Sequence, residues 1–279
     1  MRYEGKTVAV TGAARGIGLA IAQAFYAEGA AVALGDLDLE PAVEAAGELG
    51  DRAHAIQLDV TDRASFDDFL TQAEQRFGPV HILVNNAGIM PTGDFLDEPA
   101  EMTDQVLAVN LRAVLTGSQL AAQRFRAEGR PGAIVNIASL AGLSYASGVS
   151  TYCATKHAVV GASGSLAREW ESDGIRVLAV LPCLVATDLS AGATRPRWGR
   201  ALLEATPEKI AAGVLRALAG GGTRVAVPAG ADVLLRLLDT LPYPLRRSAE
   251  RLFGLDAMYG NADPHIRRKY HERLGHQLH

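Results

Sequence analysis

Short apolar runs alternate with longer helical segments through the first 230 residues, and this alternation limits the folds open to the chain. Runs that are apolar throughout are typical of parallel strands buried on both faces. Strands and helices in this order predict an α/β fold, in which helices cover both faces of a parallel sheet. The expected strands are residues 6–11, 31–36, 53–58, 80–84, 133–137, 176–181 and 224–227. The expected helices include residues 62–77, residues 101–128 and a segment that carries Tyr152 and extends to about Ser172.

A glycine-rich turn, Gly12-Ala13-Ala14-Arg15-Gly16-Ile17-Gly18, follows the first strand and precedes a helical segment. A strand, a glycine turn and a helix in this order direct backbone N–H groups and a helix N-terminus toward a phosphate. The glycine spacing differs from the commoner dinucleotide-binding pattern, in which one residue separates the first two glycines. For this segment taken alone, a plain turn between strand and helix is the alternative.

The second strand ends on an acid, Asp36, which lies 18 residues after Gly18. An acid at this place in a dinucleotide-binding fold accepts a hydrogen bond from the adenosine ribose 2′-hydroxyl. The alternative is that Asp36 caps the helix that follows. We favour the ribose role because the strand and the acid occur together.

Tyr152 and Lys156 are four residues apart, so on a helix they lie on one face, one turn apart. A free tyrosine loses its proton only near pH ~10. A nearby ammonium group favours the phenolate, which makes the pair suitable for proton transfer near neutral pH. A solvated helix face is the alternative for this pair taken alone.

Taken together, these features resemble the short-chain dehydrogenase/reductase family over roughly residues 5–230. The motifs that carry the resemblance occur in the family's order: the Thr11-Gly12-x3-Gly16-Ile17-Gly18 turn, the Asn85-Asn86-Ala87-Gly88 block, Asn110, Ser139, and the pair Tyr152 and Lys156. The family implies a doubly wound, Rossmann-like sheet of seven strands, a nicotinamide cofactor and hydride transfer between an alcohol and a carbonyl group. We therefore expect a dinucleotide-binding and catalytic domain over residues 1–230 and a helical C-terminal extension over residues 231–279.

The resemblance also implies roles for four catalytic residues. Tyr152 would be the general acid/base, and Lys156 would lower its pKa and bond the nicotinamide ribose. Ser139 would donate a hydrogen bond to the substrate oxygen, where charge develops as the hydride moves. Asn110 would hold a water molecule that links Lys156 to solvent.

Cofactor contacts carry over from the family in the same way. The expected contacts are Gly12, Arg15, Gly16, Ile17 and Gly18 at the phosphates, Asp36 and Leu37 at the adenosine ribose, Asp59 and Val60 at the adenine, Asn86, Ala87 and Gly88 along the adenosine side, and Tyr152, Lys156, Pro182, Val185 and Thr187 at the nicotinamide end. The chain departs from the family at Cys183, because the family usually has glycine after this proline. A side chain there narrows the backbone conformations available, and we expect the Cys183 thiol to serve packing.

Two residues bear on the choice between NAD and NADP. Asp36, followed by the apolar Leu37, favours NAD(H), because a carboxylate repels a 2′-phosphate. Arg15 weakly favours NADP(H), because a basic residue there can meet that phosphate. We give Asp36 more weight, since the free-energy cost of a buried carboxylate next to a 2′-phosphate is larger than the gain from an exposed arginine.

Composition and charge exclude several other classes of protein. The 279-residue chain has a net charge of −4, which gives no reason to expect nucleic-acid binding. Its beginning lacks the apolar segment of a signal peptide, and no run reaches the ~18 apolar residues of a membrane span. The two cysteines, Cys153 and Cys183, form no spaced framework. We expect a cytoplasmic protein with reduced thiols and no metal site.

The segment after the sixth strand, residues 184–205, is expected to cover the active site and to carry substrate specificity. Apolar side chains there and in earlier loops suggest a pocket for a lipophilic alcohol or ketone. The expected lining residues are Met90, Leu140, Leu143, Tyr145, Leu184, Leu189, Trp198, Leu202 and Leu203. Ordinary core packing is the alternative, and Arg195, Arg197 and Arg200 offer a third possibility, an acidic group on the substrate.

Some 50 residues follow the last expected strand. Apolar stripes at helical spacing start at Val233 and Leu245, and four of the seven histidines lie in the last 15 residues without a metal-binding spacing. This segment has three interpretations. It is a packed extension with a solvated basic end, a lid or subunit arm near the pocket, or an amphipathic segment that contacts an anionic membrane surface.

We therefore predict an NAD(H)-dependent oxidoreductase that interconverts a secondary alcohol and a ketone, preferably lipophilic, with Tyr152 as the acid/base. The alternatives are an NADP(H)-dependent carbonyl reductase and a dinucleotide-binding sensor without turnover. The intact catalytic set argues against a sensor, which could lose the acid/base without penalty. The family further implies a homo-oligomer, a dimer or tetramer, with the long helices around Asn110 and Tyr152 as contact faces.

Overall fold

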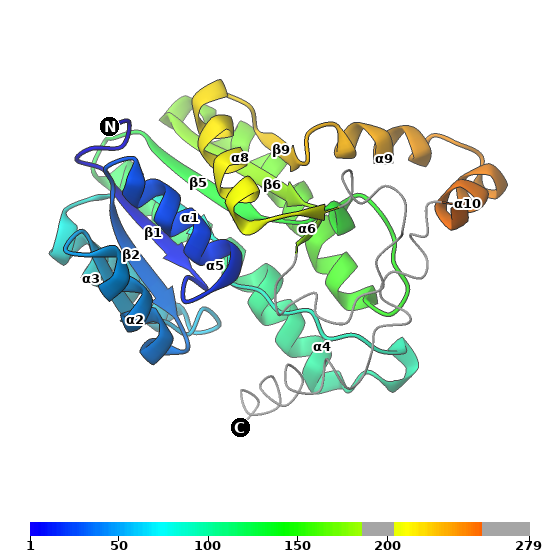
Figure 1. The fold of residues 1–279 in the computed structure, drawn as a ribbon, viewed down its shortest axis with the longest axis horizontal. Helices are drawn as coiled ribbons and strands as arrows, with labels where there is room; N and C mark the ends of the chain where they lie inside the picture. The colour runs from blue at the N-terminus through cyan, green and yellow to red at the C-terminus, as the bar shows by residue number, and fades with distance from the viewer. Residues whose placement is uncertain (186–203, 253–279) are drawn as a thin grey trace.

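The computed structural model describes residues 1–185 and 204–252 of the chain. Within these residues, seven parallel strands form one sheet in the order β3-β2-β1-β4-β5-β6-β9 (Figure 1). The strand order reverses between β1 and β4, which is the doubly wound arrangement that the sequence predicts. The strands are β1 (Thr7–Thr11), β2 (Ala31–Asp36), β3 (Ala53–Gln57), β4 (Val80–Asn85), β5 (Gly132–Ile137), β6 (Ile175–Pro182) and β9 (Arg224–Val227).

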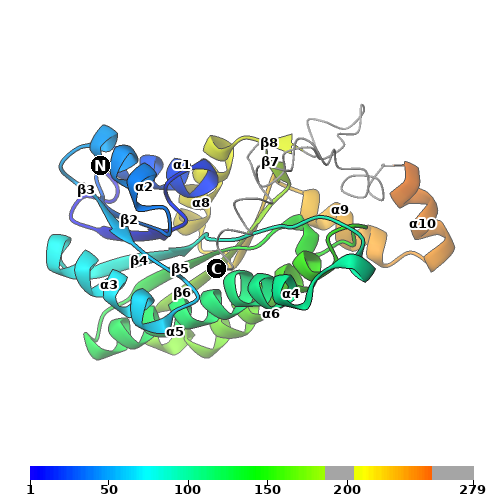
Figure 2. The same ribbon diagram turned by 90° about the horizontal axis from the view of Figure 1, so that it is seen from below.

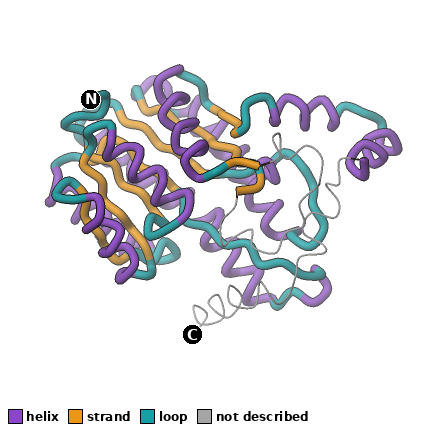
Figure 3. Tube along the Cα trace, viewed as in Figure 1, coloured by secondary structure: helices purple, strands orange, loops and turns teal. Residues whose placement is uncertain are grey.

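Helices cover both faces of this sheet. Figure 2 shows α1, α2 and α8 on one face and α3, α5 and α6 on the other, and Figure 3 shows the strands as the layer between them. Phe25 and Val214 belong to the apolar core on the first face, and Phe66 and Phe125 to the core on the second. The helices are α1 (Gly16–Ala27), α2 (Leu39–Leu49), α3 (Arg63–Phe77), α4 (Ala100–Leu107), α5 (Ala113–Ala127), α6 (Ser150–Glu169), α8 (Pro207–Gly220), α9 (Ala231–Asp239) and α10 (Tyr243–Leu252).

Every predicted strand is present, with bounds that differ from the prediction by at most one residue at either end. The predicted helix over residues 101–128 is different in one respect. It is divided by a π-helical turn, Ala108–Arg112, which joins α4 to α5. Such turns are rare and occur frequently at functional sites, and nothing in the local sequence pattern predicts one here. Helix α6 ends at Glu169, earlier than predicted, and a 3-10 turn, Glu171–Asp173, follows it.

The C-terminal extension begins directly after β9. Helices α9 and α10 lead away from the sheet toward one end of the molecule (Figure 1). Ala231 belongs to the main core and Leu235 packs against it, whereas Val233, Leu237 and Leu245 are 56%, 61% and 59% exposed. The start of α9 is therefore packed on the core while its outer face is exposed, and the role of the extension stays a prediction.

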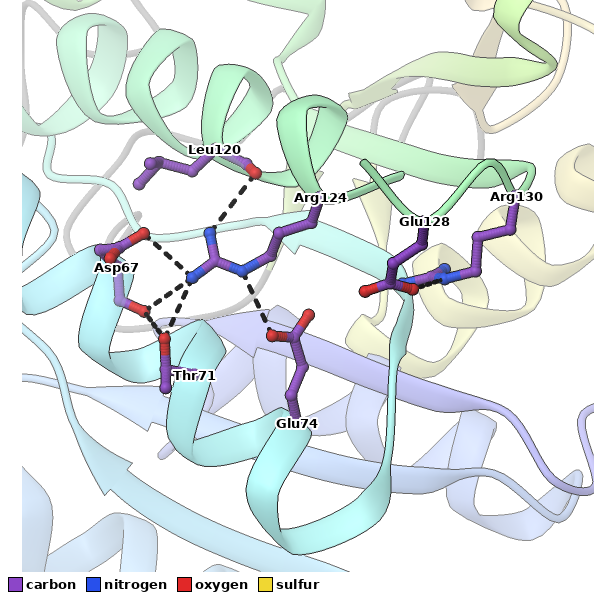
Figure 4. A network of polar contacts seen from close by, with 7 residues as sticks. All are labelled: Asp67, Thr71, Glu74, Leu120, Arg124, Glu128 and Arg130. Carbon is purple, nitrogen blue, oxygen red and sulfur yellow. Dashed lines mark hydrogen bonds and ion pairs between the residues drawn. The ribbon is translucent and has the colours of Figure 1, made fainter. Parts of the chain in front are cut away.

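Arg124 on α5 ties this helix to α3 on the same face of the sheet (Figure 4). Its Nη2 donates to the Asp67 carboxylate at 2.9 Å and to the Thr71 hydroxyl at 3.1 Å. Its Nε donates to one oxygen of Glu74 at 3.3 Å. The other oxygen of Glu74, Oε1, is buried and has no hydrogen-bond partner within the described residues, so this carboxylate depends on Arg124.

Replacing Arg124 by alanine should lower the free energy of unfolding by about 1–3 kcal/mol, because the half-buried Glu74 carboxylate loses its counter-charge. Urea unfolding followed by circular dichroism measures this change. Arg126→Ala is the matched control, since Arg126 is half exposed and pairs with Asp173 at the surface. Surface pairs of this kind contribute about 0–1 kcal/mol. Equal losses in the two variants would contradict the structural role of Arg124.

Candidate active site

The predicted site residues gather at the carboxyl ends of the central strands. Thr11 ends β1, Asn86 follows β4 and Ser139 follows β5, and these three strands are neighbours in the sheet. Because parallel strands bring their carboxyl ends to one edge, loops far apart in the sequence meet there. This edge is where doubly wound proteins bind their ligands.

Three glycines shape the turn between β1 and α1. Gly12 and Gly16 have φ angles of +63° and +58°, which favour glycine. A Cβ on Gly18 would lie 2.1 Å from the backbone oxygen of Gly12, so a side chain there is excluded. Helix α1 starts at Gly16 with neither a side-chain cap at Arg15 nor an acid in its first turn. This cradle fits the phosphates of a dinucleotide, which would accept hydrogen bonds from the first-turn N–H groups.

Thr11 and Asn86 lock the glycine turn to the loop after β4. The Thr11 hydroxyl oxygen accepts from the backbone N–H groups of Asn86 and Ala87, both at 3.0 Å. The Asn86 side-chain amide donates to the carbonyl oxygens of Thr11 and Gly12, both at 2.9 Å. Asn86, predicted to line the adenosine side, thus directs its amide to the turn. Thr11 was not predicted as a site residue, although its place at the end of β1, next to the glycine turn, could have indicated one.

Asn85, which precedes Asn86, serves the interior of the protein. Its side-chain amide donates to Asn136 on β5 at 2.9 Å and to Ser118 on α5 at 3.2 Å. Asn136 in turn donates to Ser163 on α6 at 3.0 Å. All four side chains are buried. The Asn85 side-chain oxygen is itself buried without a hydrogen-bond partner among the described residues, so this network is completed on its donor side and links β4, β5, α5 and α6.

Asp36 lies beside the glycine turn. Its carboxylate accepts from the backbone N–H of Ala14 at 2.9 Å and from that of Asp38 at 3.1 Å. The alternative that Asp36 caps the next helix is wrong, because α2 starts at Leu39 and Asp38 holds the cap position. The adjacent Leu37 is exposed.

Arg15 is paired with Asp38, which was not predicted as a site residue. Its Nη2 lies 2.7 Å from Oδ2 of Asp38, and both side chains are about one-third exposed, at 39% and 34%. The sequence Asp36-Leu37-Asp38 has a second acid close to the glycine turn, and this acid could have indicated a partner for Arg15. The positive charge that favoured a 2′-phosphate is therefore partly neutralised by a neighbouring carboxylate.

The remaining predicted cofactor residues are only partly placed. Asp59 and Val60 follow β3, and the Asp59 carboxylate accepts from the backbone N–H and the hydroxyl of Thr61, at 2.8 and 2.7 Å. Pro182 ends β6 and Val185 lies in β7 (Leu184–Val185). Thr187 lies outside the described residues. The contacts of these residues with adenine and nicotinamide stay predictions.

Cys183 occupies the position where the family usually has glycine, and its backbone does not adopt the positive φ angle that would favour glycine. No described residue other than glycine has a positive φ, and the Cys183 backbone N–H donates to the Val227 oxygen at 2.9 Å. Its side chain is buried in the main core, as the packing role predicts. Cys153, next to Tyr152, is also buried, and burial raises the pKa of its thiol. A thiol of this kind is a weak nucleophile.

Lys156 is buried beside Tyr152. Only 4% of it is exposed, and its Nζ donates to the Ile137 carbonyl oxygen at 2.9 Å. The same Nζ lies 5.5 Å from the centre of the Tyr152 ring. Burial lowers the pKa of Lys156 from 10.5 to about 8. At neutral pH the group is still mostly protonated, so a positive charge is held next to the tyrosine.

Asn110 lies in the π-helical turn and is fully buried. Its side-chain oxygen accepts from the Ile89 N–H, and its amide donates to the Ile89 oxygen, both at 2.8 Å. The amide also lies 3.4 Å from the Thr155 hydroxyl on α6. A Cβ on Gly88 would lie 3.3 Å from the Asn110 oxygen and 3.7 Å from the Lys156 Nζ, so these residues form one cluster. The relay water assigned to Asn110 stays a prediction.

Ser139 ends the stretch after β5 and caps a 3-10 turn, Leu140–Gly142. Its hydroxyl oxygen accepts from the Ala141 N–H at 3.1 Å, which leaves its proton available for a substrate oxygen. This turn packs on α6, because a Cβ on Gly142 would lie 2.7 Å from the backbone oxygen of Lys156. Ser139 is thereby fixed against the helix that carries the tyrosine and the lysine.

The predicted pocket residues divide into several groups. Met90 is buried and packs with Val149 and Tyr152. Leu140 lies in the main core and Leu143 packs against that core, and their contact with a substrate stays a prediction. Tyr145 is more than half exposed, and Leu184 is buried in β7. The lining residues and arginines between 189 and 203 lie outside the described residues.

Both ends of the predicted covering segment are placed. β7 pairs in parallel with β8 (Glu204–Ala205), with Leu184 opposite Glu204 and Val185 opposite Ala205. The chain therefore returns to the point at which it left the sheet. Within residues 1–185 and 204–252, the helices are all too short or too polar to cross a membrane.

Comparison with known proteins agrees with this geometry. The family model described as short chain dehydrogenase matches residues 6–198. Sorbitol dehydrogenase of Cereibacter sphaeroides is 42% identical over 185 residues, which cover 66% of this chain and 72% of that protein. Galactitol 2-dehydrogenase of Agrobacterium fabrum is 39% identical with the same coverage. 3beta-hydroxysteroid dehydrogenase 2 of Eggerthella lenta is 36% identical over 225 residues, 75% of this chain and 85% of that protein.

Replacing Lys156 by methionine should remove a pH dependence of stability. The pKa of Lys156 is about 8 in the folded protein, against an ordinary value of 10.5. Between these values the unfolded chain binds more protons, so the wild-type free energy of unfolding rises with pH, by roughly 3 kcal/mol in total. Methionine fills similar space and does not titrate, so the variant should lack this rise.

Urea unfolding from neutral pH to above the ordinary lysine pKa measures the difference between the two proteins. Lys209→Met is the matched control, because Lys209 is exposed and should leave the wild-type pH dependence unchanged. A wild type and a Lys156→Met variant with the same pH dependence would contradict the buried, shifted lysine.

Proposed function

The chain belongs to the short-chain dehydrogenase family, and on this basis we propose that it is an NAD(H)-dependent oxidoreductase that interconverts a secondary alcohol and a ketone. The observation that carries the proposal is the buried Lys156 ammonium beside Tyr152, 5.5 Å from the centre of the ring. A positive charge in that position favours the phenolate, which is the form that accepts a proton. When bound, a nicotinamide dinucleotide supplies the hydride acceptor or donor.

In alcohol oxidation, Tyr152 accepts the hydroxyl proton as the carbonyl group forms, and in the reverse direction it returns that proton. Ser139 donates its hydroxyl proton to the substrate oxygen, where negative charge develops. Lys156 stabilises the phenolate throughout, and its contact with the Ile137 carbonyl fixes its position. Asn110 holds the loop after β4 against α6 and completes the path by which a proton reaches solvent through water.

The proposal of NAD(H) over NADP(H) rests on two carboxylates near the turn. Asp36 is positioned at the end of β2 by the Ala14 N–H and would bond the 2′-hydroxyl of the adenosine ribose. Asp38 pairs with Arg15, which lowers the attraction that Arg15 would offer to a 2′-phosphate. Both carboxylates repel that phosphate.

We propose a lipophilic substrate because Tyr152 packs in a cluster of apolar side chains that includes Met90 and Val149. A second candidate is a polyol, which is favoured by the names of the relatives sorbitol dehydrogenase and galactitol 2-dehydrogenase. A panel of secondary alcohols that includes a steroid, a long-chain alcohol, sorbitol and galactitol separates the two candidates.

A homo-oligomer is part of the proposal. Leu107 on α4 and Leu115 on α5 are 37% and 41% exposed although both side chains are apolar. These helices flank the π-helical turn, and they are the faces at which the family resemblance leads us to expect subunit contacts.

Replacing Tyr152 by phenylalanine should lower kcat about 10²- to 10⁴-fold, the usual range for loss of a general acid/base. The change removes one hydroxyl and keeps the ring, so NADH binding should change far less than kcat. Absorbance of NADH measures turnover, and NADH fluorescence measures binding. Turnover that survives the substitution would contradict the role of Tyr152.

Replacing Asp36 and replacing Asp38 should affect different cofactors. Asp36→Ala should weaken NAD⁺ use by about tenfold or more, the usual effect of losing a hydrogen bond to a charged group. Asp38→Ala keeps that bond and releases Arg15, so it should mainly increase NADP⁺ use. Ratios of kcat/KM for the two cofactors measure both effects. A wild type that prefers NADP⁺ would contradict the assignment of Asp36.

A further inference from the structure

Three side chains from separate parts of the chain stack next to the candidate active site. The rings of Tyr145, from the loop before α6, and His157, on α6, have centroids 5.5 Å apart and planes that differ by 18°. The guanidinium carbon of Arg246, on α10, lies 4.5 Å from the centre of the Tyr145 ring. We call these three residues the Arg246 stack. It links the C-terminal extension to the helix that carries the catalytic residues.

Both ends of the Arg246 stack are anchored. His157 follows Lys156 directly, and its Nδ1 lies 2.9 Å from the backbone oxygen of Cys153. Arg246 also forms an ion pair with Asp239 at the end of α9, so α9 and α10 are joined at the same residue. A planar guanidinium that is paired at its edge presents its face to an aromatic ring. The stack therefore orients α10 relative to α6.

Tyr145 belongs to a loop that borders the catalytic tyrosine. The loop runs from Ser139 to the start of α6, and two of its residues, Ala146 and Val149, pack in the cluster that contains Tyr152. Gly148 in this loop accepts from the Gly93 N–H at 3.1 Å, which joins it to the loop after β4. In Figure 1, α10 lies at the same end of the molecule as these loops. An extension held by Tyr145 is thus held on the substrate side.

Ala231 and Leu235 pack the start of α9 on the main core. The described part of α10 buries little apolar surface, which makes the Arg246 stack important to its position. Val233 and Leu237 on α9 are exposed, as are Tyr243 and Leu245 on α10. A cation–π contact changes a docking equilibrium by roughly two- to thirtyfold, depending on how far it is desolvated. A contact of this size is large enough to change the position of α10 measurably.

We propose that Arg246 and Tyr145 determine substrate specificity by holding the C-terminal extension over the substrate side, where its apolar residues contact bulky lipophilic alcohols. This inference rests on the proposed function. A small alcohol stays close to Tyr152 and does not reach α10, so its turnover does not depend on the extension. A long or polycyclic alcohol reaches past them and meets α10. Arg246 and Tyr145 are positioning residues, since neither takes part in the proton or hydride step.

The test uses the full chain and four single variants. Tyr145→Ala and Arg246→Ala each remove one member of the stack, and Tyr145→Phe keeps the ring. Arg236→Ala is the matched control, because it removes an exposed arginine from α9. Hydrogen–deuterium exchange of residues 231–252 reports docking without requiring activity, and kcat and KM are measured for 2-propanol and for a long-chain secondary alcohol.

We expect faster exchange over residues 231–252 in Tyr145→Ala and Arg246→Ala, and wild-type exchange in Tyr145→Phe and Arg236→Ala. The two alanine variants should raise KM for the long-chain alcohol about tenfold, within the range of the lost contact. Arg246→Ala, which lies outside the predicted pocket, should leave the kinetics of 2-propanol within about twofold. The rise in KM for the long-chain alcohol should be no larger in the double alanine variant than in Arg246→Ala, because both substitutions remove the same contact between Arg246 and Tyr145.

Unchanged exchange in both alanine variants would overturn the Arg246 stack. Faster exchange with equal losses for the two alcohols would overturn the specificity role. A lower molecular mass of Arg246→Ala in light scattering would overturn it in favour of a subunit contact. Failure of the proposed function is distinguishable from failure of this inference, because the wild type would then turn over no alcohol. Hydrogen–deuterium exchange in the variants would still decide whether the Arg246 stack holds the extension.

Discussion

The active-site architecture depends on one buried charge, the ammonium group of Lys156. Its Nζ has the Ile137 carbonyl as a hydrogen-bond partner and lies next to the ring of Tyr152. Removing a charge from water is unfavourable, which is why the pKa of Lys156 falls to about 8. Three separate parts of the chain hold this group in place: the end of β5, the loop after β4 and α6. The position of Lys156 therefore depends on the order of the strands in the sheet as well as on the spacing of Tyr152 and Lys156.

The other constraints follow from the same edge of the sheet. The glycine turn after β1 leaves room for phosphates, and Asn86 holds it from the loop after β4. The π-helical turn between α4 and α5 places Asn110 between that loop and Thr155 on α6. Each of these contacts joins neighbouring elements, so a ligand at the edge meets a surface that is already organised. This preorganisation is what electrostatic catalysis requires.

The strands were predictable because buried parallel strands are apolar throughout, and the motif spacing identified the family. The π-helical turn at Asn110 was not predictable, because the helical sequence pattern continues through it. The ion pair of Arg15 with Asp38 depends on how the turn meets the end of β2, and the lock of Asn86 on Thr11 depends on the neighbouring positions of β1 and β4. The C-terminal extension had three interpretations from its sequence, because an apolar stripe does not specify its partner. The contact of Arg246 with Tyr145 spans 101 residues, and no local pattern reports such a contact.

The most direct test of the central claim is an ultraviolet titration of the Tyr152 phenolate in the NAD⁺ complex, taken as wild type minus Tyr152→Phe. If Lys156 activates the tyrosine, the phenolate forms well below the ordinary tyrosine pKa of ~10. The same difference titration in a Lys156→Met background should then move up toward that ordinary value. A phenolate that forms near pH ~10 in both backgrounds would contradict the account, because the buried ammonium would then have no effect on the tyrosine it faces.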